Sequence, residues 1–259
     1  MSITQLKIFG ERNSGTNWVE ETVMSNYEVS LVHHRGVIGK SITDEQRALL
    51  RMYGQQERRF IRERFIDAIF EEQFVQFFGW KHSCVDYNLL RDCPSFNETG
   101  FIFLVKNPYS FIKSLHQKPY HELLNVPDSL DSFVSSPWLA VQRDLIANPL
   151  LETPVELWNY KVSSYFKFMK YSKNSLLLKY EDLLSDPHCL FEAIESRFSI
   201  SAVNKTVITK STKSDVLSIN DYRKKYLIDD PKDGLSEVSL DFMKGAIDLQ
   251  VAGACGYEI

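Results

Sequence analysis

The chain has 259 residues, of which 44% are hydrophobic and 25% are charged, and its formal net charge is −4. A chain of this length and composition can bury the core of one large α/β domain. The negative net charge argues against nucleic acid as a partner, because nucleic-acid-binding proteins present an excess of basic residues to phosphate. We therefore expect one globular domain over residues 1–259.

Five short apolar runs predict the strands of a sheet, and they alternate with stretches that favour helices. The runs are 6–9, 29–33, 77–81, 101–105 and 176–179. This alternation is typical of a mostly parallel sheet with helices on both faces. The sequence thus predicts a three-layer α/β fold, P-loop-like, with a central sheet flanked by helices. Ligands of such sheets bind at the carboxyl ends of the strands, so residues that follow a strand are the first candidates for a site.

The first predicted strand runs into a glycine-bounded loop and then a helix, within residues 8–18. Gly10 and Gly15 frame four residues, as in a P-loop, and the backbone N–H groups and helix dipole of such a turn attract an anion. Residues 16–17 are Thr-Asn, where the ATP-binding form of the loop has Lys and then Ser or Thr. We expect a cradle for phosphate or sulfate that differs from an ordinary ATP cradle. The alternative is a structural turn with a side-chain N-cap. The candidate caps are Asn13 and Ser14.

A second strand-to-helix segment follows the apolar run at 101–105. Lys106 comes directly after this run, Pro108 suits the first turn of a helix, and Ser114 lies roughly two turns further along it. A cation at the end of the strand and a hydroxyl on the next helix can hold one phosphate from two sides. The alternative is a surface lysine beside a solvated serine.

Three segments resemble those of sulfotransferases that use 3′-phosphoadenosine-5′-phosphosulfate (PAPS). Residues 14–18, Ser-Gly-Thr-Asn-Trp, resemble the Ser-Gly-Thr-Thr-Trp loop of that family. Lys106 and Ser114 stand where the family has an Arg and a Ser that bind the 3′-phosphate, and Lys keeps the charge without the planar fork of Arg. Residues 180–187 resemble its Tyr-Glu-Asp-Leu…Asp-Pro segment. The resemblance implies a PAPS-dependent sulfotransferase whose nucleotide product is 3′,5′-adenosine bisphosphate (PAP).

The same resemblance implies the residues that bind the cofactor. The loop would hold the 5′-phosphosulfate, Trp18 and Tyr180 would lie near the adenine, and a late basic segment would close over the 3′-phosphate. The implied residues are Arg12, Asn13, Ser14, Gly15, Thr16, Asn17, Trp18, Lys106, Ser114, Tyr180, Arg223 and Lys224.

His82 is the residue that we expect to act as general base. Sulfuryl transfer to an alcohol or amine is an in-line attack on sulfur and needs a group that accepts the acceptor's proton, and imidazole titrates near neutrality. Lys81 and His82 resemble the Lys-Thr-His segment of cytosolic sulfotransferases, with the middle residue missing. The alternative is a histidine that only bonds to backbone. Rival bases are His33, His34 and His116.

Asn13 departs from the family pattern, in which a lysine before Ser-Gly-Thr neutralises the leaving phosphate. Arg12 or Lys81 could supply this cation, and both join His82 as catalytic candidates. Without such a cation, the chain would be a catalytically weak nucleotide-binding relative. A P-loop small-molecule kinase is a further alternative, although the loop lacks the lysine that a kinase would use.

Residues 44–78 are rich in charged and aromatic side chains at near-helical spacing and predict a helical insertion. The simplest interpretation is amphipathic helices packed on the sheet with a solvated basic face. The functional interpretation is a cap over the acceptor pocket, with an arginine facing an anionic substrate. We expect the segment to help define the acceptor site.

The remaining features concern metal, membrane and location. The four cysteines lack the spacing of zinc ligands, the first strand begins close to the N-terminus, and no apolar run approaches the ~20 residues of a membrane span. We expect no metal, no membrane span, reduced cysteines and a cytoplasmic location. The expected acceptor is a small molecule or glycan precursor with a hydroxyl or an amine.

Overall fold

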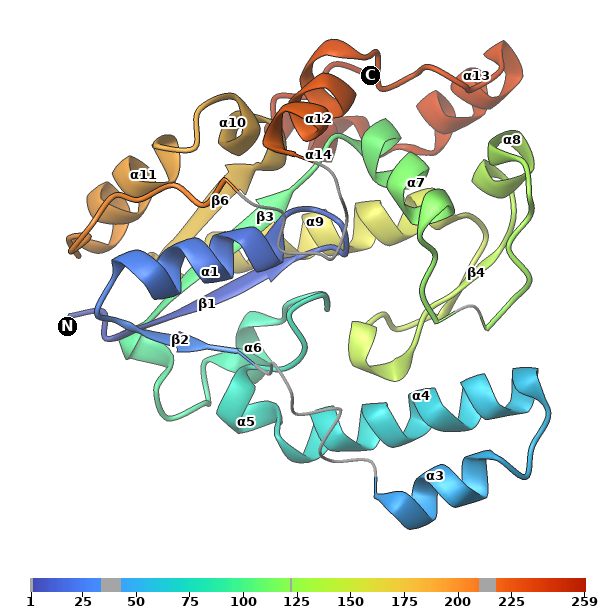
Figure 1. Ribbon diagram of the computed structural model, residues 1–259, viewed down its shortest axis with the longest axis horizontal. Coiled ribbons are helices and arrows are strands. Elements are labelled where there is room, and N and C mark those ends of the chain that lie inside the picture. The colour runs from blue at the N-terminus through green and yellow to red at the C-terminus, as the bar shows by residue number, and fades with distance from the viewer. Residues whose placement is uncertain (1, 34–42, 122, 210–217) are drawn as a thin grey trace.

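The computed structural model describes residues 2–33, 43–121, 123–209 and 218–259. A four-stranded parallel sheet in the order β2-β1-β3-β6 lies at its centre, with helices on both faces (Figure 1). The strands are β1 (Gln5–Gly10), β2 (Ser30–Val32), β3 (Thr99–Val105) and β6 (Ser175–Lys179). The predicted three-layer α/β fold is therefore confirmed.

The two faces of the sheet carry separate cores because successive strand residues point to opposite sides. Leu6 and Ile8 of β1 belong to the core that includes α1 (Thr16–Asn26) and α11 (Cys189–Phe198). Phe9 belongs to the larger core, which includes α9 (Pro154–Met169). The runs of apolar residues that predicted the strands arise from this burial on both sides.

Other elements connect and flank these layers. The helices are α3 (Asp44–Leu50), α4 (Gln55–Glu72), α5 (Phe74–Phe77), α6 (Tyr87–Leu90), α7 (Pro108–Gln117), α8 (Leu130–Val134), α10 (Tyr180–Ser185), α12 (Ile219–Arg223), α13 (Glu237–Ala246) and α14 (Leu249–Ala254). Shorter helical turns are η1 (Phe96–Glu98), η2 (Gln142–Asp144) and η3 (Lys224–Ile228), and a small antiparallel pair is β4 (Trp138–Leu139) with β5 (Leu150–Leu151).

The strand predicted at 77–81 is wrong. Helix α5 ends at Phe77, and the next two residues both take positive φ, 55° at Phe78 and 75° at Gly79. A strand cannot continue through two consecutive left-handed residues. The chain instead makes a turn, closed by the N–H of Ser83 donating to the oxygen of Trp80 at 3.0 Å. This turn still lies at the end of β1.

The segment 44–78 is helical and forms α3, α4 and α5, which lie to one side of the sheet in Figure 1. Buried ion pairs join it to the rest of the chain. Arg143 in η2 donates from Nη1 to Oδ1 of Asp67 at 2.7 Å and from Nη2 to Glu63, both on α4. The insertion is thus attached through charge as well as through apolar packing.

Candidate functional site

A pocket of about 340 Å³ opens where β1 and β6 end. Its wall includes Arg12, residues 15–18, His82 and Tyr180. Apolar side chains from later in the chain complete it, among them Leu183, Leu184, Ile208 and Ile219. The pocket therefore lies at the carboxyl ends of the strands, where the sequence predicts a ligand site.

The loop of residues 10–16, called the glycine loop below, requires its two glycines. A Cβ on Gly10 would stand 2.8 Å from Cβ of Leu104. Gly15 has φ 85°, and a Cβ there would meet the ring of Tyr180 at 2.8 Å. Helix α1 begins after Gly15 without a side-chain cap, so the two candidate caps do not serve as caps. The hydroxyl of Ser14 instead donates to the oxygen of Glu11. A helix N-terminus with no side-chain cap beside a pocket suits an anion.

Lys106 and Ser114 meet, as their spacing predicts. Nζ of Lys106 lies 2.9 Å from Oγ of Ser114 and donates to the backbone oxygen of Asn13 at 3.2 Å. The pair therefore lies directly against the glycine loop. Both residues are buried, and neither contributes to the wall of the pocket.

Tyr226 covers this pair, and sequence reasoning missed it. The centre of its ring is 3.6 Å from Nζ of Lys106, and its hydroxyl is 3.1 Å from Oγ of Ser114. The signal for it was the spacing of Tyr222 and Tyr226, one helical turn apart within the basic segment. Tyr222 itself lines the pocket.

Arg223 and Lys224, the basic residues of the same segment, do not line the pocket. The guanidinium of Arg223 donates from Nε to the oxygen of Leu184 at 2.8 Å, which attaches α12 to α10. Lys224 is exposed. The aromatic residues of this segment, rather than the basic ones, face the site.

His82 lies in the pocket wall with one ring nitrogen fixed. Nδ1 is 2.5 Å from the backbone oxygen of Gly10, so Nδ1 carries the proton and Nε2 remains an acceptor. Burial, with the positive charges of Lys81 and Arg12, lowers the pKa of His82 well below its usual value. The imidazole is therefore neutral at neutral pH, and this is the form that can accept a proton.

The rival histidines lie elsewhere or outside the described residues. Nε2 of His116 is 2.9 Å from the oxygen of Pro127, and neither His116 nor His33 lines the pocket. His34 falls in 34–42, which the structure does not describe. Among the histidines with described positions, His82 is the one in the pocket wall.

The two candidate cations differ in their surroundings. Nζ of Lys81 bonds to Oδ1 of Asn17 at 2.7 Å and pairs with Glu20 at 2.9 Å, so a carboxylate offsets its charge. The guanidinium of Arg12 instead lies over two aromatic rings, 4.7 Å from the centre of Tyr120 and 5.6 Å from that of Trp80. Its Nε is buried with no hydrogen-bond partner among the described residues. Arg12 is the cation better placed to meet an anion in the pocket.

A buried network of charged side chains lies behind Arg12 and His82, and sequence reasoning missed it. Nζ of Lys161 is 2.6 Å from both Glu11 and Asp144, and the hydroxyl of Tyr120 donates to Glu11. Burial raises the pKa of Glu11, whereas the two carboxylates raise that of Lys161 against its burial. The sequence did contain a signal for the burial of Lys161. This residue lies on the apolar stripe of α9, between Trp158 and Tyr165. The other two residues of the stripe are buried as well.

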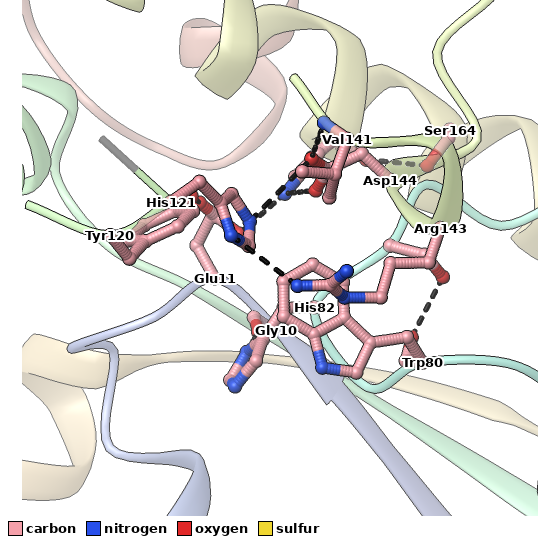
Figure 2. A network of polar contacts seen from close by, with 12 residues as sticks. Gly10, Glu11, Trp80, His82, Tyr120, His121, Val141, Arg143, Asp144 and Ser164 are labelled. Carbon is pink, nitrogen blue, oxygen red and sulfur yellow. Dashed lines mark hydrogen bonds and ion pairs between the residues drawn. The ribbon is translucent and has the colours of Figure 1, made fainter. Parts of the chain in front are cut away.

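The network continues to Glu63 of the insertion through His121 and Arg143, which Figure 2 shows beside Trp80. His121 has φ 65°, and its Nδ1 is 3.0 Å from Oε2 of Glu63. Burial alone would raise the pKa of Glu63, but the bond from His121 and the charge of Arg143 outweigh it and hold this pKa to about 2. The guanidinium of Arg143 lies 4.7 Å from the centre of the Trp80 ring, whose other neighbours include His82 at 5.0 Å between ring centres. The network therefore supports the wall of the pocket from behind.

The described part of the chain holds neither a cluster of metal ligands nor a membrane-spanning helix. No group of three or more His, Cys, Asp or Glu residues there is arranged to hold a metal ion. No helix in the described ranges has the length and apolar character needed to cross a membrane. None of the residues that line this pocket comes from 44–78, and the role of that segment at the acceptor site stays a prediction.

Comparison with known proteins gives similarity to solved structures only. No family model matches the chain, and no curated protein matches it. The chain is similar over 100% of its length to the sulfotransferase domain from the Synechococcus PCC 7002 olefin synthase, at 16% identity, 96% coverage of that domain and a TM-score of 0.48. It is also similar over 100% of its length to the sulfotransferase domain from the curacin biosynthetic pathway, at 12% identity, 99% coverage of that domain and a TM-score of 0.42. Because both TM-scores lie below 0.5, we assign no residue role from these similarities.

Proposed function

We propose that this protein is a PAPS-dependent sulfotransferase that acts on a hydroxyl or an amine of a small-molecule or glycan acceptor. The observation that carries the proposal is the contact of Lys106 with both Ser114 and the backbone of Asn13. This contact brings a cation and a hydroxyl against the glycine loop, so two anion sites adjoin. A nucleotide with phosphate groups at both its 5′ and 3′ positions matches such a pair of sites.

The residues around the pocket fit this nucleotide. The uncapped N-terminus of α1 suits the 5′-phosphosulfate, and Lys106 with Ser114 suits the 3′-phosphate. The aromatic side chains of Trp18 and Tyr180 line the same pocket and suit an adenine ring. The buried Nε of Arg12 has no hydrogen-bond partner among the described residues, and a phosphate oxygen of the nucleotide would supply one.

PAPS, when bound, supplies the sulfuryl group that is transferred. His82 accepts the proton of the attacking hydroxyl or amine at Nε2, and the bond from Nδ1 to Gly10 fixes its tautomer and orientation. Arg12 offers positive charge where the leaving phosphate becomes more negative. The rings of Tyr120 and Trp80 hold the Arg12 guanidinium in place without neutralising it.

The pairing of Lys81 with Glu20 favours a second candidate function. If Arg12 does not replace the lysine that the family carries at the position of Asn13, the protein binds the nucleotide without efficient transfer. Such a nucleotide-binding protein shares the binding site of the enzyme and differs only in turnover. Turnover therefore separates the two candidates.

The test has two stages on the full chain. Calorimetric titration with PAP, 5′-AMP and ATP, with and without Mg²⁺, establishes the ligand, and selective binding of PAP supports the proposal. Binding of ATP that requires Mg²⁺ would instead identify a kinase. PAPS turnover is then measured by release of PAP over a panel of alcohols and amines, with Arg12→Ala as the inactive control. Binding of PAP without turnover on any acceptor would favour the non-catalytic candidate.

A further inference from the structure

Tyr226 lies against Lys106 and Ser114, where a phosphate bound by this pair would lie. Its ring lies 3.6 Å from Nζ of Lys106, and its hydroxyl bonds to Oγ of Ser114 at 3.1 Å. Tyr180 lies on the same cation, at 4.8 Å, and meets the ring of Tyr226 edge-on. Aromatic faces lie on the positive charge, and the phenol adds a bond to the one that Ser114 donates to the oxygen of Ser110 at 2.7 Å, so the chain itself covers the pair.

The cover is complete enough to exclude a ligand. Lys106 is 2% exposed and Ser114 is 5% exposed. Burial raises the pKa of the Tyr226 phenol, which keeps this group neutral beside the lysine. A phosphate cannot reach Lys106 and Ser114 together while the ring of Tyr226 remains there.

The segment that carries Tyr226 belongs to neither of the two cores of the sheet. No residue of α12 or η3 is fully buried. The bond from Arg223 to Leu184 attaches α12, and Nζ of Lys225 bonds to Oε1 of Gln117 at 2.6 Å. Segments with little buried surface open at a small cost in free energy. Tyr226 can therefore leave the pair without disruption of either core.

We propose that Tyr226 is the gate of the second phosphate subsite and sets the nucleotide specificity of the pocket. A nucleotide with phosphates at the 5′ and 3′ positions displaces Tyr226 when it binds, whereas a nucleotide with a single 5′-phosphate leaves it in place. This inference rests on the proposed function. It predicts that the 3′-phosphate binds more tightly once the ring is removed, because ligand and ring no longer compete.

The first test compares PAP and 5′-AMP by calorimetry in the wild-type chain, Tyr226→Ala, Tyr226→Phe and Ile228→Ala. Tyr226→Ala should bind PAP roughly 5- to 30-fold more tightly, the range of a partly desolvated cation–π contact, and should leave 5′-AMP unchanged. Tyr226→Phe, which keeps the ring, should gain less. Ile228→Ala changes an exposed side chain on the same segment and should match the wild type. Unchanged or weaker PAP binding by Tyr226→Ala would overturn the gate.

The second test needs no nucleotide and so separates the gate from the proposed function. Lysines are acetylated with acetic anhydride and quantified by peptide mass spectrometry, with the exposed Lys173 as the internal standard. Lys106 should be protected in the wild type and in Ile228→Ala, and should approach the reactivity of Lys173 in Tyr226→Ala. Equal protection in all three proteins would overturn the gate. Exposure of Lys106 in Tyr226→Ala without binding of either nucleotide would count against the proposed function alone.

Discussion

Gly10 and His82 are joined by a hydrogen bond of 2.5 Å between the backbone oxygen of the glycine and Nδ1 of the histidine. The N–H of Gly10 also donates to the oxygen of Lys81 at 2.9 Å. Gly10 thus holds the turn of residues 80–83 through Lys81 and His82, and it is also the first residue of the glycine loop. Any movement of the loop consequently moves the proposed base with it.

Replacement of His82 by Asn tests the base. The Asn amide can keep the donor to Gly10, but it offers no ring nitrogen that accepts a proton. Turnover should fall by ~10²–10⁴, the usual contribution of general base catalysis, while PAP affinity stays close to that of the wild type. His116→Asn, on a residue outside the pocket wall, is the matched control and should remain active. A His82→Asn enzyme as fast as the control would place the base elsewhere.

Replacement of Lys106 by Met tests the second anion site. Loss of a charge-assisted bond costs about 1.5–3 kcal/mol, so PAP should bind about 10- to 150-fold more weakly. Binding of 5′-AMP should change far less, because that nucleotide has no 3′-phosphate. Lys113→Met, on helix α7, which follows Lys106 in the chain, provides the control in both calorimetric titrations. Equal losses for PAP and 5′-AMP would mean that Lys106 supports the pocket as a whole.

Replacement of Lys161 by Met tests the buried network. The change leaves the carboxylates of Glu11 and Asp144 without their shared cation, and breaking a buried ion pair costs about 3–5 kcal/mol. The free energy of unfolding, measured in urea, should fall by this amount. Lys167→Met changes the exposed side of the same helix and should stay within about 0.5 kcal/mol of the wild type. Similar stability of the two variants would show that the carboxylates are accommodated as neutral acids.

Lys7 should make stability depend on pH above neutrality. Burial in β1 is the main cause that lowers its pKa from 10.5 to about 7. Between these values the unfolded chain binds the proton and the folded chain does not, so stability rises with pH. The free energy of unfolding should increase by about 2 kcal/mol from pH 7 to pH 9.

The Lys7→Met variant is the control for that pH dependence. It removes the titrating group and keeps an apolar side chain of similar length in the sheet. Its free energy of unfolding should therefore lack the rise attributed to Lys7 over the same pH range. An equal rise in both proteins would assign the effect to another group.

Local patterns predicted the parts of the site that depend on neighbouring residues. The contact of Lys106 with Ser114 follows from helical spacing, because the two residues are 8 apart and belong to one strand-to-helix segment. The glycine loop is equally local. The sheet was predictable for a similar reason, since strands buried on both faces leave continuous apolar runs.

Contacts between distant residues could not be predicted in this way. Tyr226 is 112 residues from Ser114, and Glu11 is 150 residues from Lys161. Nothing in the local pattern of either partner specifies the other, because tertiary packing alone brings them together. The false strand at 77–81 has a different origin. Phe78 and Trp80 are buried, but two left-handed residues turn the backbone away from a sheet.

The attachment of α4 limits how far this chain can be rebuilt. Glu63 and Asp67 lie one helical turn apart and hold Arg143, which in turn packs on Trp80 behind the pocket. A shortened chain without residues 44–78 would leave the guanidinium of Arg143 without the carboxylates of Glu63 and Asp67. The insertion therefore cannot be exchanged for an unrelated helical segment. A replacement helix would have to carry an acidic pair in the same register, or arrive together with a change at position 143.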